Sequence, residues 1–176
     1  MTGTTVHIPT LTTERLMLRA PRVQDADAFA AFYASPRASF VGGPLSAERA
    51  WRSMAQEAGH WVLRGYGRWV LEEHATGKAV GCVGLWFPEG FPERELGWDL
   101  FEGATGKGYA TEAGRAARDY AYDVLGWTTV ISLIADGNDG SVGVAKRLGA
   151  TLDGTFPHDH FGPTQIWRHP APKVRA

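Results

Sequence analysis

Residues 103–126 read GATGKGYATEAGRAARDYAYDVLG, and glycine occurs three times before an alanine-rich run begins. Because glycine loses more conformational freedom on folding than any other residue, Gly103, Gly106 and Gly108 predict a tight turn with unusual backbone angles. The alanine-rich run predicts a helix that begins near Gly108. The first amides of a helix lack partners within it, and glycine lets an anion approach them. The stretch therefore predicts an anion-binding turn at a helix N-terminus.

The alanine-rich run places its small side chains at helical spacing. Small residues on one face predict a helix that packs very closely on a sheet, while the charged opposite side is expected to face water. The expected small face consists of Ala110, Ala113, Ala117, Ala121 and Val124.

The rest of the chain alternates between strand-like and helix-like patterns. The order β-α-α-β-β-β-α-β-α-β-β predicts one mixed sheet covered by helices, an α/β (α+β) fold. Apolar runs predict strands at 14–20, 67–74, 79–87, 93–101, 128–135, 151–156 and 164–169. Helical spacing predicts the other helices at 25–35, 47–64 and 139–150. The apolar stripe expected within 47–64 is Trp51, Met54, Ala58 and Trp61.

Composition limits the classes of protein that the chain can represent. It has 176 residues, of which 44% are hydrophobic, and a formal net charge of −1. These values predict one domain at residues 11–169, between flexible ends at 1–10 and 170–176. A net charge near zero favours neither nucleic acid nor an anionic membrane, so neither partner is expected. The N-terminus lacks signal-peptide features and Cys82 is the only cysteine, which together predict a cytoplasmic protein.

A glycine-rich turn before a helix has several interpretations. A Walker loop is not matched, because Gly108 follows Lys107 and no serine or threonine stands in the required place. A dinucleotide fingerprint would need a third glycine where Thr111 stands, and no β-α-β unit opens the chain. Two interpretations stay open at this point: a plain left-handed turn without a ligand, and a nucleotide-binding enzyme that uses the turn for ATP or NAD.

Three segments together resemble the GNAT acetyltransferases. ELGWDLFEGATGKGYATEA (95–113) resembles their acetyl-CoA-binding motif, in which a strand precedes Q/R-x-x-G-x-G/A; Gly108 and Ala110 match, and Thr105 replaces the Gln or Arg. NDGSVGVAKRLGA (138–150) is similar to the N-x-x-S…K-L-G-F segment of the family. TERLMLRAPRVQDADAFAAFY (13–33) resembles the opening of the ribosomal-protein N-terminal acetyltransferase branch, the RimJ/RimL type.

The resemblance covers about residues 11–156 and implies both a fold and an activity. The implied GNAT fold has a mixed, mostly antiparallel sheet of six to seven strands with about four helices, splayed at the strands before and after the cofactor-binding helix. The implied activity is transfer of an acetyl group from acetyl-CoA to a primary amine, by direct attack in a ternary complex and without a metal. A non-catalytic CoA-binding or regulatory domain stays open, because Thr105 and Ala145 depart from the family pattern.

The resemblance also implies which residues bind acetyl-CoA. The strand before the turn offers amides to the pantetheine and the acetyl carbonyl, and the turn holds the pyrophosphate. Lys146 and Arg147 lie within reach of the 3′-phosphate, or else simply complement the helix dipole. The implied set is Trp98, Asp99, Leu100, Phe101, Gly106, Lys107, Gly108, Tyr109, Ala110, Thr111, Asn138, Ser141 and Lys146.

Two residues are the candidate catalytic groups. Glu95 stands where related enzymes often hold a water-linked carboxylate base; an exposed strand carboxylate or an ion-pair partner of Arg94 are the alternatives, and Asp99 is a second candidate base. The tyrosine that often protonates the thiolate in this family is replaced by Ala145. The RimJ/RimL branch instead suggests Ser141 as the proton donor, the alternative being an ordinary serine at a helix start.

The acceptor side is less defined by the sequence, and a protein N-terminus and a small-molecule amine both stay open. In the aromatic loop before the active strand, core packing explains Trp86, whereas Phe87 and Phe91 are candidates for the acceptor site, as is the segment HDH (158–160). The two histidines of that segment share a strand face, but no third ligand is evident, so metal binding is not expected. A monomer and a homodimer are both compatible with the sequence.

Overall fold

One eight-stranded sheet runs through the computed structural model, which describes residues 6–159 and 162–172. The strands lie in the order β1-β2-β3-β4-β5-β6-β8-β7, and only β5 and β6 are parallel neighbours. Their bounds are β1 (Leu11–Thr12), β2 (Leu16–Arg19), β3 (Arg68–Glu73), β4 (Ala79–Trp86), β5 (Glu95–Leu100), β6 (Ile131–Ala135), β7 (Thr151–His158) and β8 (Gly162–Arg168).

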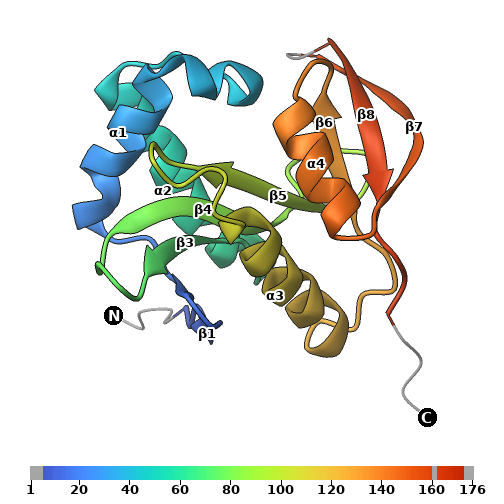
Figure 1. Ribbon diagram of the computed structural model, residues 1–176, viewed down its shortest axis with the longest axis horizontal. Coiled ribbons are helices and arrows are strands. Elements are labelled where there is room, and N and C mark those ends of the chain that lie inside the picture. The colour runs from blue at the N-terminus through green and yellow to red at the C-terminus, as the bar shows by residue number, and fades with distance from the viewer. Residues whose placement is uncertain (1–5, 160–161, 173–176) are drawn as a thin grey trace.

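Helices pack on both faces of this sheet (Figure 1). Helix α3 packs on β4 and β5, whereas α2 packs on β3 and on α1; α4 contacts β6 and α3. None of the helices in the described ranges is long and apolar enough to cross a membrane. The helices are α1 (Ala26–Ala34), α2 (Ala47–Arg64), α3 (Tyr109–Asp123) and α4 (Asp139–Arg147), with short 3₁₀ helices η1 (Val23–Asp25) and η2 (Pro36–Val41).

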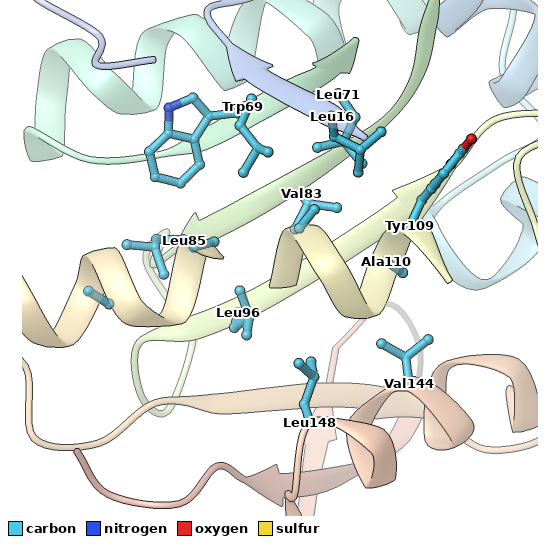
Figure 2. Packing of buried hydrophobic residues seen from close by; sticks show 14 of the residues in the cluster. Leu16, Trp69, Leu71, Val83, Leu85, Leu96, Tyr109, Ala110, Val144 and Leu148 are labelled. Atoms are coloured by element: carbon cyan, nitrogen blue, oxygen red, sulfur yellow. The ribbon is translucent and has the colours of Figure 1, made fainter. Parts of the chain in front are cut away.

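The central strands bury both of their faces. Successive side chains of a strand point to opposite sides, and Leu71 and Val83 join the cluster that contains the alanines of α3 (Figure 2). Val70 and Cys82 join a second cluster with α1 and α2. The sheet is therefore a middle layer between α3 on one side and the α1–α2 pair on the other.

Helix α3 packs on the sheet as its alanines predict. Ala113, Ala117 and Ala121 have no exposed surface, so only small side chains separate the helix from the strands. Val124 was expected on the same face but is 63% exposed, because α3 ends at Asp123.

The predicted mixed, mostly antiparallel sheet is confirmed, with one strand more than expected. The additional strand is β1, which pairs with β2 through Leu11 and Leu18. The predicted splay is also present, since β5 and β6 pair only where Glu95 lies beside Ile131 (Figure 1). The proposed domain bounds stay a prediction; residues 1–5 and 173–176, within the expected flexible ends, lie outside the described residues.

The predicted apolar stripe of α2 is wrong at Trp51, and Ala58 is only partly buried. Trp51 is 53% exposed. The buried face of α2 is rotated away from Trp51 and includes two polar residues; it consists of Ala50, Met54, Glu57, His60 and Trp61.

Candidate active site

The predicted glycine turn lies directly before α3. Gly103, Gly106 and Gly108 have φ values of 75°, 76° and 83°, a left-handed region that glycine adopts without the steric cost paid by other residues. A Cβ added at Gly106 would meet nothing within 4 Å. Backbone conformation, and not crowding by protein atoms, therefore requires glycine there, and open space lies beside the turn.

The N-terminus of α3 presents amides that no side chain caps. Gly108 is the N-cap residue, and the first helical hydrogen bond runs from the Glu112 amide to the Gly108 carbonyl at 3.0 Å. The amides of Tyr109, Ala110 and Thr111 therefore have no acceptor within the helix. Because they lie at the positive end of the helix dipole, this end of α3 can bind an anion.

Side-chain contacts from Arg15, just before β2, and from Glu73, at the end of β3, hold the turn in place. Arg15 forms an ion pair with Glu112 at 2.6 Å and also donates to the carbonyl of Lys107 at 2.8 Å. The hydroxyl of Tyr109 donates to Glu73. The turn is thus tied to the sheet on both sides of Gly108, which preorganises its amides for a ligand.

The splay leaves one edge of β5 without a strand partner beyond Glu95. The amide of Phe101 donates to the Val80 carbonyl, toward β4. Since backbone groups alternate in direction along a strand, the amides of Trp98 and Leu100 face the gap and that of Asp99 faces β4.

The prediction that Phe101 offers its amide to the cofactor is therefore corrected. Its ring also points away from the gap, with its centroid 5.2 Å from that of Phe29 and 5.5 Å from that of Phe32. Phe101 is a core residue that secures the end of β5.

A cavity of about 1000 Å³ extends from the turn into the splay. Cavities that hold small ligands have this order of size. Every residue of the predicted site lines it except Phe101 and Lys146. The predicted residues in its wall are Glu95, Trp98, Asp99, Leu100, Gly106, Lys107, Gly108, Tyr109, Ala110, Thr111, Asn138 and Ser141.

Glu95 lies in the cavity wall at the first position of β5. Its Oε1 accepts a hydrogen bond from the Leu133 amide at 3.2 Å, which joins it to β6. Arg94, a possible ion-pair partner, instead lies over the ring of Trp127, with its Cζ 4.7 Å from the centroid. Burial raises the pKa of Glu95 to about 7. The carboxyl group can therefore gain and lose a proton near neutral pH, as a general base must.

Ser141 lies in the first turn of α4 and contacts β5 across the gap. Asn138 caps the helix, because its Oδ1 accepts from the Ser141 amide at 3.2 Å. The indole N–H of Trp98 donates to the Ser141 hydroxyl at 3.2 Å. A hydroxyl that accepts one hydrogen bond keeps its own proton available, so Ser141 is oriented as a donor. Its role in catalysis stays a prediction.

Two charged residues in the cavity wall, Glu57 and Arg68, were not predicted from the sequence. Arg68 of β3 pairs with Asp99 of β5 and, at 3.2 Å, with Glu57 of α2. Glu57 is 4% exposed, and burial raises its pKa to about 7. Because Asp99 is held in an ion pair, Glu95 is the better candidate base.

The sequence does contain one signal for this cluster. Glu57 falls at helical spacing with Ala50, Met54 and Trp61, all of them buried. A carboxylate on an otherwise apolar stripe must find a partner or a function, since burying a charge alone is very costly. The identity of its partner, Arg68, is set by the sheet and cannot be derived from the pattern of α2.

Of the two basic residues at the end of α4, only Arg147 reaches the cavity. Its Nε donates to Thr111 Oγ1 at 3.3 Å. Lys146 points elsewhere, with Nζ 5.7 Å from the ring centroid of Trp167. The predicted cofactor contact is therefore moved from Lys146 to Arg147, because adjacent residues of a helix project in different directions.

Part of the expected acceptor site lines the cavity. Phe91 and His158 are in its wall, and their rings lie 5.7 Å apart. Trp86, which was expected in the core, also lines the cavity. Phe87 does not line the cavity, and its ring lies beside Arg64. His160 lies outside the described residues. Within residues 6–159 and 162–172 there is no cluster of three or more potential metal ligands.

Comparison with known families identifies the class of protein. The Acetyltransferase (GNAT) domain matches residues 15–151, a range that contains the turn, α3, both splayed strands and Ser141. The chain therefore belongs to the GNAT family, and it is an acetyl-CoA-dependent N-acetyltransferase.

Individual relatives cover most of the chain. The chain is 37% identical to an acetyltransferase from Agrobacterium tumefaciens C58, with a TM-score of 0.85 over 96% of this chain and 98% of that one. It is 30% identical to the uncharacterized protein YkkB of Bacillus subtilis over 79% of this chain and 83% of the relative. The ribosomal-protein-S5-alanine acetyltransferase of Vibrio fischeri has the same fold, with 16% identity, a TM-score of 0.73, and coverage of 96% and 100%.

Proposed function

We propose that this acetyltransferase acts on an α-amino group with a carbonyl on the neighbouring carbon, as in a peptide N-terminus or an amino-acid amide. The observation that carries the proposal is a gap in the cavity wall over Gly97. An added Cβ at Gly97 would lie 3.8 Å from Glu95 Oε2 and 3.9 Å from Arg68 Nε. One proton acceptor and one donor therefore flank the same small space.

The donor in this pair has no partner within the protein. Arg68 Nε is buried and makes no hydrogen bond to any described residue, and a buried donor left unpaired costs free energy. A carbonyl oxygen next to the attacking amine would accept from Arg68 while the amine faces Glu95. An isolated side-chain amine, as in a polyamine or an aminoglycoside, has no carbonyl in that place.

Two solved structures with this fold have names that state a protein acceptor. Solved structures with this fold include a ribosomal-protein-S5-alanine acetyltransferase and a ribosomal L7/L12 α-N-protein acetyltransferase bound to coenzyme A. Both structures are 16% identical to this chain, and an identity this low indicates a shared fold only. The proposed acceptor class is therefore inferred from the gap over Gly97.

The cavity wall fits acetyl-CoA on structural grounds. The uncapped amides of α3 and the open space beside Gly106 suit a pyrophosphate. The free edge of β5 offers the amides of Trp98 and Leu100 to a pantetheine arm laid along the gap. Arg147 provides a cation at the far end of the turn.

The chemistry follows from these positions. Acetyl-CoA supplies an activated acetyl group as a thioester. The acceptor nitrogen bonds to the acetyl carbon and loses its proton to Glu95, directly or through water, as the carbon–sulfur bond breaks. An amide of the free β5 edge stabilises the oxyanion, an effect that typically contributes several kcal/mol. Ser141 donates a proton to the leaving thiolate.

A thiol-release assay with matched acceptors tests the proposal. Alanine amide and a short peptide are expected to be acetylated at least tenfold faster, by kcat/KM, than putrescine or an aminoglycoside. Gly97→Ala places a methyl group in the gap and is expected to raise the acceptor KM several-fold with CoA affinity unchanged. Equal rates on all four amines, or preference for the amines without a carbonyl, would overturn the acceptor assignment.

A further inference from the structure

Arg37 reaches the phosphate-binding turn from a distant part of the chain. It belongs to η2 and lies 68 residues before Thr105, yet its Nη1 donates to Thr105 Oγ1 at 3.4 Å. Its Nη2 donates to the carbonyl of Leu100 at 3.2 Å. The guanidinium therefore spans the junction between the free edge of β5 and the turn, and it lines the cavity.

The charge of Arg37 is not neutralised within the protein. Two other cations next to the turn have acidic partners, since Arg15 pairs with Glu112 at 2.6 Å and Lys107 lies 3.9 Å from Glu73. Arg147 contacts the other end of the turn, at Thr111. No acidic side chain of the described residues forms an ion pair with Arg37. A guanidinium has five N–H donors, and the two contacts at Thr105 and Leu100 leave the others available.

The segment that carries Arg37 is held firmly. Pro36 begins η2 with a restricted φ, and Ala38 is completely buried. Gly43 closes against Ala38 so tightly that a Cβ there would collide with it. Arg37 is thus an exposed side chain on a fixed backbone, which limits the entropy lost when it binds a ligand.

We propose that Arg37 binds the pyrophosphate of coenzyme A and supplies the full positive charge that the turn itself lacks. The inference rests on the proposed function. The amides of α3 contribute partial charges only, and Arg15 and Lys107 are paired with acidic side chains, whereas a pyrophosphate carries at least two negative charges. Arginine pairs with phosphate oxygens through two parallel hydrogen bonds, which suits a guanidinium held at the end of the turn.

Calorimetry with three ligands separates this role from a structural one. Arg37→Gln is expected to weaken the binding of CoA and of 3′-dephospho-CoA by about tenfold each, because both ligands keep the pyrophosphate. Binding of pantetheine, which has no phosphate, is expected to stay as in the wild type. Arg52→Gln is the matched control, since Arg52 is an exposed arginine of α2 outside the cavity wall.

A second variant restores the charge from another position. Thr105→Arg combined with Arg37→Gln is expected to recover most of the lost CoA affinity, because a guanidinium returns to the same end of the turn. Unchanged CoA affinity in Arg37→Gln would overturn the inference, as would an equal loss for all three ligands. Wild-type protein that fails to bind CoA at all would overturn the proposed function itself, and the inference with it.

Discussion

The two walls of the cavity are built in different ways. The turn wall, residues 105–111, presents backbone amides of one continuous segment. The carboxylate wall presents charged side chains from three elements: Glu57 of α2, Arg68 of β3, and Asp99 and Glu95 of β5. The turn wall can bind anions at any pH at which the protein is folded. The carboxylate wall holds two groups whose pKa is raised to about 7.

This difference divides the work of the site. Backbone amides do not titrate, so we expect the turn wall to bind the permanently charged cosubstrate and to set its position. Carboxyl groups whose pKa is near 7 gain and lose protons in the neutral range, so we expect the carboxylate wall to take the proton of the acceptor amine. Substitutions in the two walls should therefore separate cleanly into effects on cofactor affinity and effects on pH dependence.

The largest expected effect comes from Glu95→Gln on the carboxylate wall. Burial raises the pKa of Glu95 to about 7, so wild-type kcat/KM for the acceptor should rise with pH and level off above about 7. Without the base, the rate above pH 7 should fall by about a hundredfold and that inflection should disappear. Steady-state kinetics from pH 6 to 9 measure both.

Cofactor binding is the control for this variant. CoA affinity of Glu95→Gln should match the wild type, because Glu95 lies outside the turn wall. An equal loss of rate at every pH, with the inflection retained, would show that Glu95 positions the acceptor and that another group takes the proton.

A smaller effect is expected from Gly108→Asp on the turn wall. The new carboxylate would lie at the N-cap of α3, where it competes with an anionic ligand for the free amides. Affinity for CoA should fall at least tenfold, or ~1.4 kcal/mol, with no change in the pH profile of the remaining activity. Calorimetry gives the affinity.

Strain alone must be excluded for this variant. Gly126→Asp is the matched control, because Gly126 also has a positive φ of 69° but lies outside the cavity wall. If both variants lose affinity equally, backbone strain and not occupation of the anion site explains the result.

The same contrast explains what could be predicted from the sequence. The turn wall depends on a few neighbouring residues, so the glycines and the alanines of α3 were enough to predict its position at the start of α3. The free edge of β5 also followed once the strand order was implied by the resemblance to GNAT enzymes. Phe101 was misplaced because the direction of each amide depends on its pairing with β4, which a strand pattern alone does not give.

The carboxylate wall could not be predicted in the same way. Arg68 lies 11 residues from Glu57 and 31 residues from Asp99 along the chain, and only the packed sheet brings the three together. Trp51 is a related error on α2. Its hydrophobicity suggested that it faces the core, but the buried face of α2 contains the carboxyl group of Glu57 and leaves Trp51 exposed. Contacts such as Arg37 with Thr105 likewise depend on how separate elements dock.

The smallest expected effect is on stability, from Glu57→Gln on the carboxylate wall. The pKa of Glu57 is raised from 4.5 to about 7 by burial, against the opposing attraction of Arg68. Between these two values the folded protein keeps a proton that the unfolded chain releases, so the contribution to the free energy of unfolding is lost as pH rises through about 7. Glutamine cannot titrate, and the variant should therefore gain stability relative to the wild type between pH 5 and 8, by on the order of 1 kcal/mol. Urea unfolding at several pH values measures this gain. Glu95 titrates in both proteins, so its effect cancels in the difference between their stabilities. Glu48→Gln is the control, because Glu48 belongs to an exposed ion pair of α2, and it should leave the pH dependence of stability unchanged. A variant whose stability runs parallel to the wild type across this range would show that Glu57 stays ionised beside Arg68, and that Glu95 is the only group of this wall to titrate near neutral pH.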